Sequence, residues 1–213
     1  EKMKLEQNRR LVTYYSLLTQ MRVNGGNDYI NLVNSILSGK CNQQACLENY
    51  DFKVMSDFNR FNNLQQKLED EFTLSRMIAG YAWEWKSKKD KSLYDMELDG
   101  VKKQWNYRLE NWVLSEGADK QVGCIHTIQG FDLNYGFVIM GNEIGYDPES
   151  KEIIVRPENY YDQNGRKTAS KEELLEYIKH IYYVLMTRGI KGTYLYICDD
   201  NLRKYVSSII GVI

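Results

Sequence analysis

The sequence is short of several features that define large classes of protein. Only two prolines occur in 213 residues, so no proline-rich linker divides the chain. The formal net charge at pH 7 is -1, which argues against a strongly basic nucleic-acid clamp acting alone. No apolar run approaches the roughly 18 residues of a membrane-spanning helix, and no signal peptide is visible. We therefore expect a cytoplasmic protein that does not enter a membrane.

Metal-binding residues are also scarce. The chain has two histidines, His126 and His180, and four cysteines that form no CxxC pair. Zinc sites need several such ligands at short, regular spacings, so we predict no metal site in this chain. Cys124 and Cys198 stand in apolar runs and are predicted to be small buried residues, which suits a reducing compartment.

The remaining sequence is that of an ordinary globular domain. Hydrophobic residues make up 43% and charged residues 27%, enough apolar surface for a real core. Strand-like runs alternate with helical patterns that begin at polar capping residues. The strands are expected at 11–23, 50–55, 75–83, within 124–141 and at 192–198, and the helix caps at Asn27 or Asp28, Ser56 or Asp57, and Thr168 or Ser170. This alternation predicts an α/β fold with a mostly parallel sheet covered by helices on both faces.

Residues 84–120 differ from the rest and are predicted to leave the main sheet. They are polar, lack a sustained period and carry three tryptophans. If the segment before them is extended, Trp83 and Trp85 point to opposite faces, so at most one belongs to the core. The neighbouring lysines and aromatic rings suggest base stacking with phosphate contacts, whereas core packing and a solvated lysine loop are the simpler readings.

The stretch "CIHTIQGFDLNYGFVIMG", residues 124–141, begins and ends apolar but is polar in its middle. We interpret it as a strand, a functional turn and a second strand. Backbone N–H groups at Thr127 and at Gln129–Gly130 are expected at a helix N-terminus, which favours an anionic ligand. In parallel sheets ligands sit at the carboxyl ends of strands, so Arg22, residues 126–132 and residues 187–192 are expected along one rim.

Three segments resemble helicase motifs. Residues 126–141 resemble motif V of superfamily 1 helicases, "YYVLMTRGIKGTYLYIC" at 182–198 resembles motif VI, and "LLTQMR" at 17–22 resembles motif IV. The chain is most similar to a bacterial helicase-related family of uncharacterised function, akin to the helicase region of schlafen proteins, in which "GYAWEW" is also typical. The resemblance implies that residues 1–213 form a single RecA-like domain, the second of two motor domains. No Walker A pattern G-x-x-x-x-G-K-S/T occurs, so we expect a fragment of a longer protein.

The resemblance also assigns roles to individual residues. Arg188 would be the motif VI arginine finger and Arg22 a second sensor of the ATP γ-phosphate, although either could be a surface salt-bridge partner. A guanidinium suits this role because it stays charged and offers a planar fork of donors to the phosphate. Gln129, Gly130 and Asp132 would contact the nucleotide, with Asp132 near the ribose and Gln129 replacing a common lysine. The Mg²⁺ ligands are expected in the missing N-terminal domain.

The same resemblance implies partners. His126, Thr127 and Trp83 would contact single-stranded DNA or RNA, and His126 is expected to orient backbone rather than act as a base. The predicted function is the second motor domain of an ATP-dependent helicase or translocase, inactive alone and paired with an N-terminal RecA-like domain. The alternative is a non-hydrolysing nucleic-acid-binding or regulatory module, which degenerate Walker motifs upstream would indicate. A nuclease site lacks support, since its candidate acids show no ligand pattern: Glu97, Asp99 and Glu110.

Overall fold

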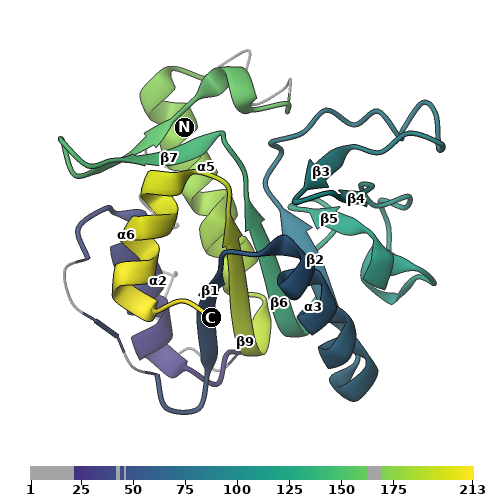
Figure 1. Ribbon diagram of the computed structural model, residues 1–213, viewed down its shortest axis with the longest axis horizontal. Helices are drawn as coiled ribbons and strands as arrows, with labels where there is room; N and C mark the ends of the chain where they lie inside the picture. The colour runs from purple at the N-terminus through teal and green to yellow at the C-terminus, as the bar shows by residue number, and fades with distance from the viewer. Residues whose placement is uncertain (1–21, 42–43, 46, 163–168) are drawn as a thin grey trace, which may run out of the picture.

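A five-stranded parallel sheet forms the centre of the protein (Figure 1). The computed structural model describes residues 22–41, 44–45, 47–162 and 169–213. All but the last two residues of the strand predicted at 11–23 lie outside it, and these two are not in a strand. The strand order is β1-β9-β6-β2-β5, and every neighbouring pair is parallel. The strands are β1 (Asp51–Met55), β2 (Ser75–Ala79), β5 (Val122–Cys124), β6 (Leu133–Met140) and β9 (Gly189–Ile197). The predicted α/β fold with a parallel sheet flanked by helices is confirmed.

Helices cover both faces of the sheet, so the strands are buried on both sides. One face packs against α2 (Gly26–Leu37), α5 (Lys171–Met186) and α6 (Asp200–Ile210). The other packs against α3 (Phe58–Phe72), whose Phe58 and Phe61 are fully buried. Successive residues of β6 alternate between the two cores, with Val138 on the first face and Phe137 on the second.

The helix caps test the sequence reasoning directly. Ser170 caps α5 with a capping box, in which the Glu173 N–H donates to its hydroxyl over 3.2 Å. Asp57 caps α3 by accepting from the Arg60 N–H over 3.0 Å. Both caps are as predicted. The cap expected at Asn27 or Asp28 is wrong, because α2 begins at Gly26 and both residues lie inside its first turn.

Residues 84–120 leave the sheet and build a small extension (teal in Figure 1). It contains the antiparallel hairpin of β3 (Met96–Leu98) and β4 (Val101–Lys103), then two 3-10 turns, η1 (Trp112–Leu114) and η2 (Ala118–Lys120). The condition for Trp83 and Trp85 to face opposite ways, an extended segment, is not met, and both rings are half-buried. Strand β2 ends at Ala79, and both rings lie near the buried Trp105, at centroid distances of 6.3 and 6.5 Å.

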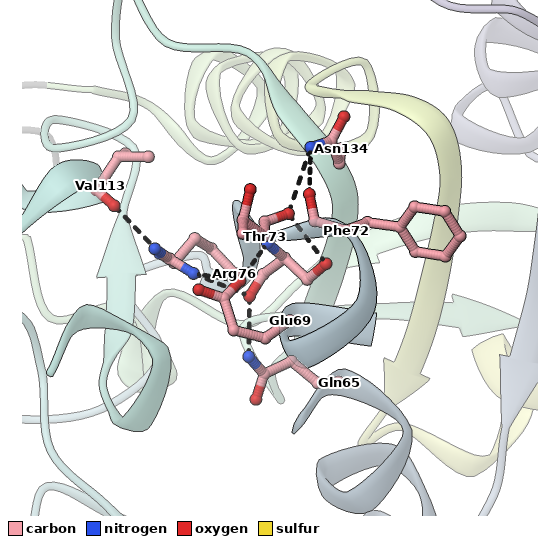
Figure 2. A network of polar contacts seen from close by, with 8 residues as sticks. Gln65, Glu69, Phe72, Thr73, Arg76, Val113 and Asn134 are labelled. Atoms are coloured by element: carbon pink, nitrogen blue, oxygen red, sulfur yellow. Dashed lines mark hydrogen bonds and ion pairs between the residues drawn. The ribbon is translucent and has the colours of Figure 1, made fainter. Parts of the chain in front are cut away.

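A buried polar network ties α3 to the sheet and to this extension (Figure 2). Arg76 of β2 forms an ion pair of 2.6 Å with Glu69 of α3 and donates from Nε to the Val113 carbonyl over 3.1 Å. Gln65 of α3 donates to the Ser75 carbonyl over 2.7 Å. Three elements are thus held in one arrangement at the amino end of β2.

A second hairpin, β7 (Ile144–Asp147) and β8 (Glu152–Val155), follows β6, and the turn η3 (Pro157–Asn159) comes after it. The hairpin packs against α5 and α6. Within the part of the chain that the structure describes, no helix is long and apolar enough to cross a bilayer.

Candidate functional site

Three of the residues singled out in the sequence gather at the amino ends of β6 and β9. The two strands are neighbours, with Leu133 paired to Gly189, and the Leu133 N–H donates to the Arg188 carbonyl over 2.9 Å. Asp132 and Arg188 directly precede these strands and therefore meet there. Arg22, Asp132 and Arg188 lie close together, as predicted. They were expected at the carboxyl ends of strands, and this is wrong for Asp132 and Arg188, because each residue directly precedes its strand.

The arginine cluster, defined as Arg22, Asp132 and Arg188, is positive and partly buried. Arg22 Nε lies 2.7 Å from Asp132 Oδ1, and Arg188 donates weakly to the Phe131 carbonyl over 3.5 Å. Arg188 Nε is buried with no hydrogen-bond partner among the described residues. Burial and the charge of Arg22 lower the pKa of Arg188, whereas Asp132 raises it. Two guanidinium groups against one carboxylate, with an unused donor, make a site that suits an anion.

Buried hydroxyl groups fix the backbone that carries Arg188. The Met186 carbonyl accepts from the Tyr29 hydroxyl over 2.7 Å and from the Thr193 hydroxyl over 3.0 Å. The Gly189 carbonyl accepts from the Tyr50 hydroxyl over 2.9 Å. Burial raises the pKa of Tyr50 to about 12, so this hydroxyl remains a donor at neutral pH. The sequence did not mark these residues; Tyr50, for example, stands between Asn49 and Asp51.

Glycines around Arg188 permit close packing. A Cβ on Gly189 would lie 2.1 Å from the Gly192 carbonyl oxygen, and one on Gly192 would lie 2.6 Å from the Asp51 Cβ. Neither glycine has a positive φ, so close packing rather than a left-handed backbone explains them. They let β9 begin with a register irregularity directly after Arg188.

The polar turn between β5 and β6 contains no helix, so the predicted helix N-terminus is wrong. Thr127 is buried, donates its N–H to the Cys124 carbonyl over 3.0 Å and accepts the Cys124 N–H over 3.1 Å. Its N–H and side chain therefore stabilise the turn rather than face a ligand. Gln129 and Gly130 are exposed, and Gly130 has φ +82, a conformation that favours glycine.

His126 and Trp83 lie toward the opposite end of the sheet. Cys124 is level with Ile139, since both pair with Ala79, and His126 follows β5 there. Its Nε2 lies 3.7 Å from Asp162 Oδ2, a partner that the sequence did not reveal.

We define the aromatic cluster as five neighbouring rings: Tyr81, Trp83, Trp85, Trp105 and His126. Tyr81 lies between the His126 ring at 5.8 Å and the Trp105 ring at 5.5 Å. Residues 126–132 run from this cluster to the arginine cluster, so one short segment joins the two groups of candidate residues.

Metal ligands are not grouped in the part of the chain that the structure describes. No three His, Cys, Asp or Glu side chains there come together in a way that could hold a metal ion.

Comparisons with known proteins place the chain in a family. No solved structure matches it. The uncharacterized protein YPL245W of Saccharomyces cerevisiae is 31% identical over 215 residues, which cover 90% of this chain and 47% of the yeast protein. The chain thus spans about half the length of that relative. The resemblance to a bacterial family stays a prediction. The family model described as "Schlafen group 3, DNA/RNA helicase domain" matches residues 1–199. The chain therefore belongs to the Schlafen group 3 DNA/RNA helicase domain family.

Proposed function

We propose that the chain is the second motor domain of an ATP-dependent DNA or RNA helicase or translocase. The family suggests a helicase-related, nucleic-acid-binding role, and the parallel sheet is consistent with a RecA-like domain. ATP and Mg²⁺ would bind between this domain and an N-terminal RecA-like domain that supplies the phosphate-cradling loop and the metal ligands. Single-stranded nucleic acid would be the partner that the motor moves along.

The arginine cluster is the observation that carries the proposal. Hydrolysis builds negative charge on the γ-phosphate oxygens, and a preorganised guanidinium stabilises that charge. Arg188 fits, because its Nε has no partner among the described residues and its backbone is held by the hydroxyls of Tyr29 and Tyr50. The cluster is suited to the phosphates of ATP, while Asp132 would orient Arg22 and approach the ribose.

The path of residues 126–132 supports coupling between nucleotide and nucleic acid. His126 belongs to the aromatic cluster and Asp132 to the arginine cluster. A shift of either end would strain the buried turn that Thr127 closes between them. We infer that this segment carries conformational change from the cleft to the bound strand.

A second candidate is a nucleic-acid-binding or regulatory module without ATP turnover. Two observations favour it. Arg22 already forms an ion pair with Asp132 at 2.7 Å, and Gln129 is exposed at the position where the resemblance to motif V implies a lysine. Both reduce the charge available to a phosphate.

Arg188→Ala in the full-length protein tests the proposal. We expect the fold to survive and ATP hydrolysis stimulated by single-stranded nucleic acid to fall by about 10³-fold or somewhat less, because Arg22 would remain. Arg188→Lys should restore little, since an ammonium lacks the planar fork. Arg60→Ala, an exposed arginine on α3, is the matched control. If the Arg188→Ala variant hydrolyses ATP at the parental rate, Arg188 is not an arginine finger and the proposed motor function loses its main support.

A further inference from the structure

A lysine-rich loop leads into the extension from the end of the sheet that carries the aromatic cluster. Its four lysines are all exposed, and none forms an ion pair within the described residues: Lys86, Lys88, Lys89 and Lys91. The acids between 84 and 91 are Glu84 and Asp90, and the Asp90 carboxylate accepts the hydroxyl and the N–H of Ser92. The loop is therefore a local positive surface on a chain of nearly neutral net charge.

Exposed aromatic rings accompany these lysines. Tyr94 is 53% exposed and Tyr107 is 50% exposed, so both rings are accessible to a ligand. Lys91 Nζ lies 5.5 Å from the centre of the Tyr107 ring, and Lys88 Nζ lies 5.5 Å from that of Trp85. Rings and ammonium groups thus stand close enough to contact one ligand together.

A cavity of about 390 Å³ opens beside the loop. Trp83 and Tyr94 contribute aromatic walls, Met96 contributes apolar surface, and Lys86 and Lys102 bring positive charge. Two carboxylates also line it: Glu97, 3.8 Å from Lys102 Nζ, and Asp95, which accepts the backbone N–H groups of Ser87 and Trp105. A flat heteroaromatic ring with an attached anion matches this lining.

Polar contacts, those of Asp95 buried and those of Gln104 exposed, hold the surface in place before any ligand arrives. Asp95 is buried and accepts the Ser87 N–H over 2.8 Å and the Trp105 N–H over 2.7 Å. Gln104 donates to the carbonyls of Lys91 and Leu93, each over 2.7 Å, and accepts the Tyr107 hydroxyl. A loop that is already ordered before binding loses less conformational entropy when it binds.

We propose that the lysine–tyrosine surface, defined as Lys86, Lys88, Lys89, Lys91, Tyr94 and Tyr107, binds single-stranded nucleic acid. Bases stack on the tyrosines and enter the cavity beside Trp83, while the lysines contact phosphates. The inference builds on the proposed function and adds a contact surface that lies outside the segments resembling helicase motifs. Single strands fit because their unpaired bases can reach rings between the lysines, whereas the paired bases of a duplex cannot.

Fluorescence anisotropy of a labelled oligodeoxythymidylate with the 213-residue chain, measured across a salt series, separates the two kinds of contact. Tyr94→Ala with Tyr107→Ala should weaken binding by about fivefold or more and leave the salt slope unchanged. Lys88→Gln with Lys89→Gln should flatten the slope of log K against log salt by about 0.7 for each lysine in phosphate contact. All four side chains are exposed, so the variants should fold, and circular dichroism checks this.

Matched controls are Tyr177→Ala, a 43% exposed tyrosine on α5, and Lys204→Gln, an exposed lysine on α6. Parental affinity and slope in both surface variants would overturn the inference. So would binding to phosphatidylserine vesicles that depends on the same residues without binding to the oligonucleotide. Because Arg188 is not involved, loss of binding here and loss of ATP hydrolysis in Arg188→Ala can each occur without the other, which separates failure of this inference from failure of the proposed function.

Discussion

At the scale of single residues, Glu143 is the most unusual side chain in the described structure. It is fully buried just after β6, and its Oε1 accepts the Tyr182 hydroxyl of α5. Its Oε2 has no partner among the described residues. Burial raises the pKa of Glu143 to about 7, against which the bond from Tyr182 acts. The folded protein therefore holds a proton here that the unfolded chain releases at lower pH.

Glu143 should make stability depend on pH. The folded pKa lies above the unfolded value of 4.5, so the folded state carries no ionisation penalty at lower pH. As pH rises from about 4.5 to about 7, the folded state loses up to about 3 kcal/mol relative to the unfolded chain. Glu143→Gln cannot ionise, so its free energy of unfolding should fall less over this window, as urea titrations at pH 5, 6, 7 and 8 would measure.

The exposed Glu149→Gln is the control for this experiment, and its pH profile should follow that of the parent. The deciding quantity is the difference in free energy of unfolding between Glu143→Gln and the parent at each pH. A difference that stays constant from pH 5 to pH 8 would mean that Glu143 is ionised throughout or that its pocket admits water.

At the scale of elements, the pair of Arg76 and Glu69 should hold α3 on the sheet. The pair is 2.6 Å apart with side chains 7% and 20% exposed, and Glu69 also accepts the Ser75 N–H over 2.7 Å (Figure 2). Arg76→Ala would leave the half-buried Glu69 carboxylate without its counter-charge and the Val113 carbonyl without its donor, so we expect a loss of about 3 kcal/mol in free energy of unfolding. Urea denaturation followed by circular dichroism measures it.

A surface pair gives the contrast. Lys179 and Glu176 lie 2.8 Å apart on α5, with the glutamate 62% exposed. Lys179→Ala should therefore cost less than about 1 kcal/mol. If Arg76→Ala costs no more than this control, the network in Figure 2 contributes little and hydrophobic packing alone holds α3.

Elements whose signals are local were predictable from the sequence. Ser170 and Asp57 begin helices because their side chains accept N–H groups only three residues away. The start of α2 was misjudged because Gly25 provides no side-chain bond, and the nearby polar residues looked like better caps. A helix was expected after Thr127 because short polar residues favour helix starts and turns alike.

At the scale of the whole molecule, the site was only partly predictable. The sequence predicted that Arg22, Asp132 and Arg188 belong to the site, but not that they meet at the amino ends of the strands. That end depends on β6 and β9 being neighbours in register, and pairing between residues as far apart as Leu133 and Gly189 leaves no local signal. Glu143 was missed for a related reason, although a lone acid after the apolar run of β6 was a visible sign.

The arrangement of the whole chain also predicts weak binding of ATP. The arginine cluster offers two guanidinium groups against one carboxylate, and the sequence has no Walker A loop to surround the phosphates with N–H groups. Isothermal calorimetry of the 213-residue chain with Mg²⁺-ATP should therefore show affinity weaker than micromolar. Any residual heat should be shared by inorganic triphosphate and lost in Arg188→Ala, because phosphate contacts would be its main source. Micromolar binding that survives Arg188→Ala would mean that a complete nucleotide site lies elsewhere in this chain, and the two-domain cleft would have to be abandoned.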